Sequence, residues 1–202
     1  LQRRDARAAL CKAVLNRQRR LHPDRATPYP EIMPTMDPHN DNPGYRLGAL
    51  MSVLERLQGE ALGKPNASVV DRYFSGASAS PRVAFTRLLK NARHHARKAA
   101  DESGGLVFRM ERLIDELLAT FGQAPASGRA VYPDPRVQLI PATLTLEDQG
   151  NFIVGYHHMR KWLWMGREER EAWNTEHADA PPAYQWRKKD AEAVDAEAVS
   201  VE

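Results

Sequence analysis

The chain has 202 residues, of which 42% are hydrophobic and 27% charged, and its net charge is +3. This length and composition fit one domain with a sizeable core and room for tails. Cys11 is its one cysteine, which excludes a disulfide framework and a cysteine-built metal site, and no apolar run approaches the roughly 20 residues that span a bilayer. We therefore expect a protein of the reducing cytoplasm without a membrane partner.

The charge is spread unevenly along the chain. Residues 176–202 carry seven acids against three bases, a balance of −4, which leaves +7 on residues 1–175 because the whole chain sums to +3. Residues 1–25 alone hold eight bases against two acids. A basic body of this kind favours nucleic acid as a partner.

The N-terminal part is expected to lie outside the main domain. Residues 1–21 should form a basic helix and residues 22–41 a proline-rich linker, because the six prolines of residues 22–43 break any helix. Since the sequence begins with Leu1, we also expect the native start to lie upstream.

A helical bundle domain is expected over residues 42–174. Its first helix should be capped by Asn42, carry Pro43 in its first turn and end at Gly63. A short helix from Asn66 to about Ser75 should follow, and the small residues of "SGASAS" should then connect it to the next helix.

That next helix is rich in positive charge. It should start at Ser80–Pro81, a serine cap followed by a residue that suits a first turn, and end in "SGG" at 103–105. At 100° per residue, an arc of about 100° collects the stripe expected to face the core, namely Phe85, Leu88, Leu89, Ala92, Ala96 and Ala99. The opposite arc of about 140° collects Arg87, Lys90, Arg93, His94, Arg97 and Lys98.

Two explanations of this positive face remain open. A charged helix face is often simply solvated surface. Solvated faces, however, usually mix signs through pairs at i,i+4, whereas here the acids stop at Asp71 and resume at Asp101. A face of a single sign favours an anionic partner.

The C-terminal half is expected to add further helices and a tail. We predict a helix over 105–121, a loop with four prolines over 122–144, and a main helix that begins after Thr145 with an Asp three residues on as a capping box. One or two turns should follow over 167–173, and residues 175–202 should form a disordered acidic tail. No strand is predicted, so the expected fold class is all-α, a bundle of four to six helices.

The common catalytic and phosphate-binding motifs are absent. Neither GxxxxGK[ST] nor GxGxxG occurs, and "SGASAS" resembles the GxSxG elbow only superficially. His94–His95 and His157–His158 are adjacent pairs whose side chains point about 100° apart on a helix, so neither pair can readily chelate one metal ion. We therefore expect no enzyme activity, no cofactor and no metal site.

Three stretches together indicate a family: "HNDNPGYRLGALMSVLERLQGEALG" at 39–63, "NASVVDRYFSGASASPRVAFTRLLKNARHH" at 66–95 and "LTLEDQGNFIVGYHHMR" at 144–160. In order and spacing they resemble the C-terminal region of the large subunit of the type I-C CRISPR Cascade effector. The resemblance covers roughly residues 37–165. In that family the same region is also made as a separate small subunit by internal translation, for which Met33, Met36 and Met51 are candidate starts and Met36 is preferred.

The resemblance implies an all-helical module without catalysis of its own that lines a guide-RNA complex. Its partners would be the other Cascade subunits (backbone subunits, the large subunit and further copies of the small subunit), the guide RNA, and target DNA, especially the displaced strand. Base pairing would read the sequence, while the protein contacts backbone and shape. The residues expected to face nucleic acid are Arg72, Arg82, Arg87, Lys90, Arg93, His94, Arg97 and Lys98.

A second class of function stays open at this point. The chain would then be a purely structural interaction module whose basic face docks an acidic protein surface. Tyr73 and Phe74 beside Arg72 offer base stacking, although packing into the core is the more common use of such residues. Binding of single-stranded DNA that weakens steeply with salt would separate the two classes.

Overall fold

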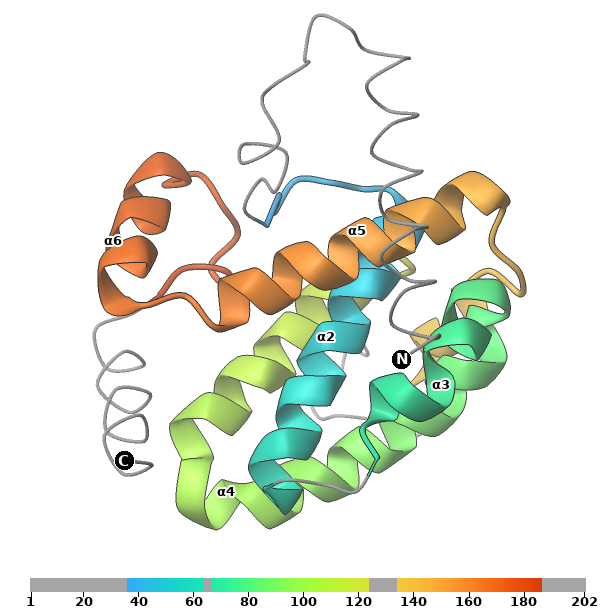
Figure 1. Ribbon diagram of the computed structural model, residues 1–202, viewed down its shortest axis with the longest axis horizontal. Coiled ribbons are helices and arrows are strands. Elements are labelled where there is room, and N and C mark those ends of the chain that lie inside the picture. The colour runs from blue at the N-terminus through green and yellow to red at the C-terminus, as the bar shows by residue number, and fades with distance from the viewer. Residues whose placement is uncertain (1–35, 64–66, 124–133, 187–202) are drawn as a thin grey trace, which may run out of the picture.

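All regular elements that the structure describes are helices. The computed structural model describes residues 36–63, 67–123 and 134–186, and no strand occurs among them. The elements are α2 (Pro43–Leu62), α3 (Val69–Ala79), α4 (Pro81–Ala119), the 3₁₀ helix η3 (Pro135–Leu139), α5 (Leu146–Leu163) and α6 (Arg167–Glu176). Figure 1 shows them as a bundle around α2. The predicted all-α fold is confirmed.

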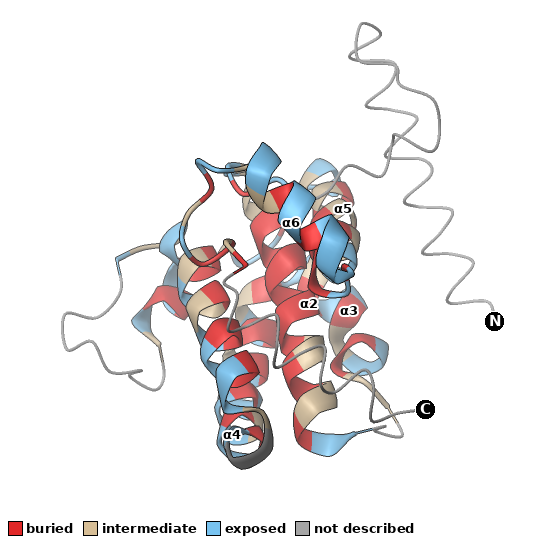
Figure 2. Cartoon of the chain, turned by 90° about the vertical axis from the view of Figure 1, so that its left-hand side faces the viewer, coloured by how far each residue is buried: buried red, intermediate tan, exposed pale blue. Residues whose placement is uncertain are grey.

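Helix α2 is the centre of the bundle, and its predicted limits are confirmed. The Asn42 side chain accepts a hydrogen bond from the Tyr45 backbone N–H at 3.0 Å, Pro43 occupies the first turn, and the helix ends at Gly63, whose φ is 66°. A positive φ suits glycine because it has no Cβ. Helix α2 is buried along most of its length, as its colouring in Figure 2 shows, because α4 and α5 pack against it.

Helices α2 and α5 touch through their backbones. A Cβ atom at Gly48 would overlap the carbonyl oxygen of Phe152, and one at Gly155 would overlap that of Tyr45. Glycine at both positions therefore permits a close crossing that any larger residue would prevent. This crossing fixes the position of α5 over the core.

Helix α4 consists of two helical segments that meet at a kink. Ser103, just before Gly104 and Gly105, has non-helical dihedral angles (φ −131°, ψ 41°), so the predicted break at 103–105 is confirmed. In Figure 1 the first half of α4 runs along the lower side of the molecule, and its second half turns back behind α2.

Helix α3 is longer than predicted and begins later. It starts after Ser68, whose side chain and that of Asp71 form a capping box, and it runs to Ala79. The segment "SGASAS", expected to be a connection, is therefore mostly helical, and Ser80 alone separates α3 from α4. The reason is packing, because Ala77 lies fully buried within this segment.

The prediction of a disordered tail is wrong for residues 175–186. Helix α6 runs to Glu176, and residues 177–186, here called the C-terminal strap, fold back onto the body with Tyr184 and Trp186 buried. Arg46 donates to the Tyr184 hydroxyl at 2.9 Å, and Asn174 exchanges two hydrogen bonds with the Trp186 backbone. These two aromatic side chains supply apolar surface that a count of acids and alanines overlooks.

The other predicted termini fall largely outside the described residues. This holds for the expected helix over 1–21, for residues 22–35 of the expected linker, and for residues 187–202 of the expected tail. The described end of the linker packs on the bundle: Met36 is fully buried, and the Asp37 backbone N–H donates to the Tyr45 hydroxyl at 2.9 Å.

Candidate nucleic-acid interface

The first half of α4 sorts its side chains as the sequence predicts. The apolar stripe is buried at Phe85, Leu88, Ala92, Ala96 and Ala99. Leu89 is only partly buried and packs against the edge of the core. The stripe rests on the central helix α2 and on α3. The opposite side of this half is thereby left to solvent.

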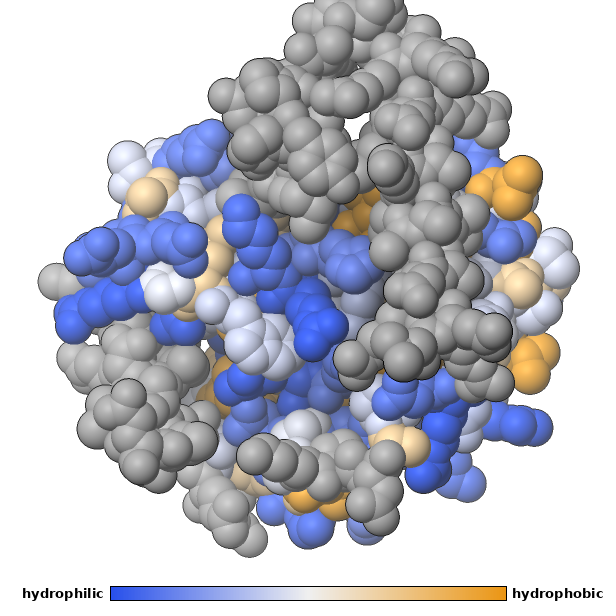
Figure 3. Space-filling view, in the orientation of Figure 1, coloured by the Kyte–Doolittle hydropathy of each residue, from blue (hydrophilic) through white to orange (hydrophobic). Residues whose placement is uncertain are grey.

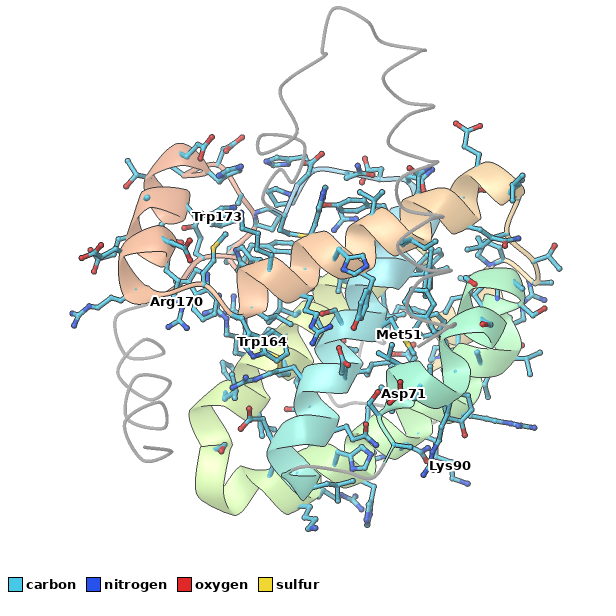
Figure 4. All side chains as sticks on the ribbon, in the orientation of Figure 1. Met51, Asp71, Lys90, Trp164, Arg170 and Trp173 are labelled. Atoms are coloured by element: carbon cyan, nitrogen blue, oxygen red, sulfur yellow. The ribbon has the colours of Figure 1, made fainter. Side chains whose placement is uncertain are left out.

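Six basic residues of this half lie on that solvent side. The set Arg87, Lys90, Arg93, His94, Arg97 and Lys98, here called the basic face, is exposed at each position. None of its members forms an ion pair with a carboxylate among the described residues. Figure 4 shows Lys90 near the lower edge of the molecule, far from α6. Among the described side chains, the face is therefore a run of positive charge without an ion-paired carboxylate, on one helical segment.

The two flanking arginines of the predicted track differ from each other. Arg72 on α3 is exposed. Arg82 is half-buried, and its Nε donates to the Ile140 backbone carbonyl at 2.7 Å, which ties the start of α4 to the loop after η3. Arg82 therefore has a structural contact that the sequence does not reveal. A ligand could bind its other two guanidinium nitrogens, because Nε is engaged.

The adjacent histidines have separate environments. His94 is exposed, while His95 is partly buried with its ring centroid 6.1 Å from that of His94. Burial lowers the pKa of His95, and the neighbouring His94 and Lys98 lower it further. His95 is therefore neutral at pH 7 and adds a polar group rather than a charge.

An acid on the second half of α4 lies within electrostatic reach of the basic face. Burial raises the pKa of the Glu111 carboxyl, Asp115 raises it further, and the charge of Arg93 opposes both. Arg93 and Glu111 lie on opposite sides of the kink at Ser103, and the effect of the one on the other shows that they are near each other. Among the described residues, the basic face thus meets negative charge at Arg93.

The aromatic residues beside Arg72 serve the core. Phe74 is buried and meets Phe152 and Tyr156 edge to face, with both pairs of ring centroids 5.2 Å apart. Tyr73 is half-buried and packs against the same cluster. Core packing, the more common use of such residues, is confirmed for Phe74, whose ring has no free face for a base.

One tryptophan at the end of α5 is exposed. Trp164 is 49% exposed, while Trp162, Trp173 and Trp186 are buried. The position of Trp164 around the helix axis explains its exposure. Trp164 follows Trp162 by two residues, or about 200°, and therefore points to the opposite side of α5.

Neither metal ligation nor membrane insertion has support in the described part of the chain. No group of three or more His, Cys, Asp or Glu side chains there is placed to hold a metal ion. No helix within the same residues combines the length and apolar character of a membrane span.

These features define a class of protein: an all-helical domain with one face of exposed basic side chains. The chain belongs to the family described as CRISPR-associated protein (Cas_Csd1), which it matches over residues 2–164. No curated protein matches the chain. The family match includes the basic face and α5 and ends before α6 and the C-terminal strap.

Proposed function

We propose that this CRISPR-associated protein is a non-catalytic helical subunit or domain of a type I guide-RNA surveillance complex. It lines the complex and contacts the nucleic-acid backbone, either the displaced strand or the guide–target duplex, during R-loop formation. Its three sequence motifs resemble those of the C-terminal region of a type I-C large subunit, the region also made as a separate small subunit. Its partners are then the other subunits, the guide RNA and target DNA.

One observation carries this proposal: the basic face is exposed and lacks carboxylate partners among the described residues. Like charges three and four residues apart on a helix repel each other. A helix that keeps five lysines and arginines exposed on one side, with no ion-paired carboxylate among the described side chains, is suited to an external anion. Phosphates on a continuous strand supply charge at the spacing of successive helical turns, and contacts with them release counterions.

The test is a double charge reversal within the basic face. Lys90→Glu with Arg97→Glu in the full chain should weaken binding of a 20-nucleotide single strand whatever its sequence. The slope of log affinity against log salt should flatten by about one unit for each phosphate that the variant no longer neutralises. Binding is measured by fluorescence anisotropy across salt concentrations, and circular dichroism checks that the variant is folded.

A single reversal elsewhere supplies the matched control. Arg167 is exposed on α6, outside the basic face, so Arg167→Glu should change affinity less than Lys90→Glu alone. An unchanged affinity and salt slope in the folded double variant would overturn the nucleic-acid proposal. If the same variant then failed to join its complex, a protein-docking role for the face would replace it.

The form in which the chain occurs is tested separately. Mass spectrometry of the native complex distinguishes a free small subunit from the end of a large subunit, because the two differ greatly in mass. If internal translation starts at Met36, Met36→Leu should remove the short product and spare the long one. A short product of unchanged size would exclude that start.

A further inference from the structure

We infer that Trp164 is a base-stacking platform for single-stranded nucleic acid, separate from the basic face. Of the four tryptophans in the chain, Trp164 alone is substantially exposed, at 49%. It follows the last residue of α5 directly, so its backbone is held by a packed helix. In Figure 4 it lies between α5 and α2, on a face that is mainly hydrophilic in Figure 3.

Two guanidinium groups from different helices hold positive charge against the indole ring. The Cζ of Arg56 on α2 lies 4.8 Å from the ring centroid, and that of Arg160 on α5 lies 5.8 Å away. Such cation–π contacts restrict the ring and cover part of it, and a base would stack on the part of the indole that remains exposed. A base stacked on the indole would have phosphates within reach of arginines that are already in position.

The charged side chains near the ring have a net positive charge. Arg56 forms an ion pair with Glu60. Glu55 accepts a hydrogen bond from the Tyr156 hydroxyl at 2.7 Å, and Arg160 donates to the same hydroxyl at 3.3 Å. Both carboxylates are thus engaged.

Next to Trp164, two cations remain without a carboxylate of their own. Neither Arg160 nor Lys161 forms an ion pair among the described residues, and both are exposed. An exposed tryptophan with arginines is also typical of protein-binding hot spots. Such hot spots are typically surrounded by contacts that exclude water, whereas Arg160 and Lys161, the charged residues just before Trp164, are exposed. The composition therefore favours a strand whose bases stack and whose phosphates meet Arg160 and Lys161.

This inference rests on the proposed function, because it assumes that the chain meets a single strand. The experiment compares two probes, a 20-nucleotide oligothymidine and an abasic strand of the same length, on the full chain. The wild type should bind oligothymidine more tightly. Trp164→Leu should reduce oligothymidine affinity about tenfold, within the range for one stacked base, and should bind the abasic strand as the wild type does.

Two control variants separate stacking from other effects. Trp164→Phe keeps a ring, so it should retain most of the preference for oligothymidine while abolishing the quenching of Trp164 fluorescence that binding causes. Phe108 is a second exposed aromatic residue beside an arginine: it is 61% exposed, and the Arg112 guanidinium lies 6.0 Å from its ring centroid. Because it lies outside the proposed stacking site, Phe108→Leu should change the affinity for neither probe.

The outcomes distinguish failure of the stacking site from failure of the proposed function. If folded Trp164→Leu keeps the preference for oligothymidine, the stacking site is excluded while the basic face stands. If Lys90→Glu with Arg97→Glu weakens both probes equally, the two sites are separate. If the wild type binds neither probe, both inferences fall. If Trp164→Leu instead reduces only the incorporation of the chain into its complex, the ring is a protein contact.

Discussion

Arginines occur in two contrasting settings in this protein. Arg46, Arg109, Arg136 and Arg170 are buried, each at most 5% exposed, whereas the arginines of the basic face are exposed. Arg109 shows the buried kind: its guanidinium donates to the backbone carbonyls of Tyr184 and Gln185 and lies 3.6 Å from the ring centroid of Trp186. Arg97, on the same helix α4, has no carboxylate partner among the described residues.

The kink at Ser103 separates the two settings. Before it, α4 has one side on the core and the other in solvent; after it, the helix runs behind α2 and meets the C-terminal strap. Arginine therefore stabilises the fold in the second half of α4 and is exposed to solvent in the first half. Burial, rather than charge count, decides which role an arginine has.

The largest effect should come from removing the surface that buries Arg109. Truncation after Asn174 deletes the C-terminal strap, and with it the buried side chains of Tyr184 and Trp186. At about 1.5–3 kcal/mol for each large side chain, the free energy of unfolding should fall by about 3–6 kcal/mol. Urea unfolding followed by circular dichroism measures the decrease.

Truncation after Trp186 is the matched control. It keeps every residue of the C-terminal strap, and its stability should equal that of the full chain. If the truncation after Asn174 were as stable as the control, the packing of Tyr184 and Trp186 would contribute nothing, and the contrast between the two arginine settings would have no physical basis.

A paired substitution tests the contrast at single residues. Arg109→Ala removes hydrogen bonds from a charged donor and a buried cation–π contact, so it should cost about 3–4 kcal/mol of unfolding free energy. Arg97→Ala should change it by no more than about 0.5 kcal/mol. Equal effects in denaturant titrations of the two variants would contradict the assignment.

Histidines extend the comparison to pH. His158 is buried, and its Nδ1 lies 3.0 Å from the Tyr45 hydroxyl. Burial lowers its pKa to about 4, with smaller contributions from the nearby charges, among which His157 and Lys161 lower the pKa and Asp37 raises it. Because the histidine of the unfolded chain titrates near 6.5, the unfolded chain binds the proton more readily than the folded chain between pH 6.5 and 4.

The free energy of unfolding should therefore have its full value above pH 6.5. As the pH drops toward 4, it should decrease by up to about 3 kcal/mol because of His158. Unfolding titrations at several pH values measure the slope. His158→Gln should flatten it. A slope that survives His158→Gln would assign the pH dependence to other groups.

Much of this arrangement follows from sequence patterns, and the remainder depends on tertiary contacts. Helical periodicity and caps predict α2 within a residue, and they separate the stripe of Phe85 from the side of Lys90. They fail at the C-terminal strap, because Tyr184 and Trp186 have no periodic neighbours and are buried only by contact with distant helices. The exposure of Trp164 also depends on tertiary contacts, since an apolar residue type does not say which side of α5 is covered.

The smallest stability effect is expected on the basic face itself, and its sign is informative. Lys90 has Arg87 and Arg93 three residues away on either side, so Lys90→Glu replaces two repulsive pairs with two attractive ones. At about 0.2–0.5 kcal/mol for each of the two repulsions removed and each of the two attractions gained, the variant should be more stable than the wild type by about 0.8–2 kcal/mol at low salt. Lys90→Gln should give roughly half the gain, and a salt concentration of about 1 M should abolish it in both. Thermal unfolding at two salt concentrations checks these values. A gain in stability together with weaker nucleic-acid binding would mean that the wild-type charge opposes folding and serves binding, whereas a decrease in stability would mean that Lys90 has a structural role like that of the buried arginines.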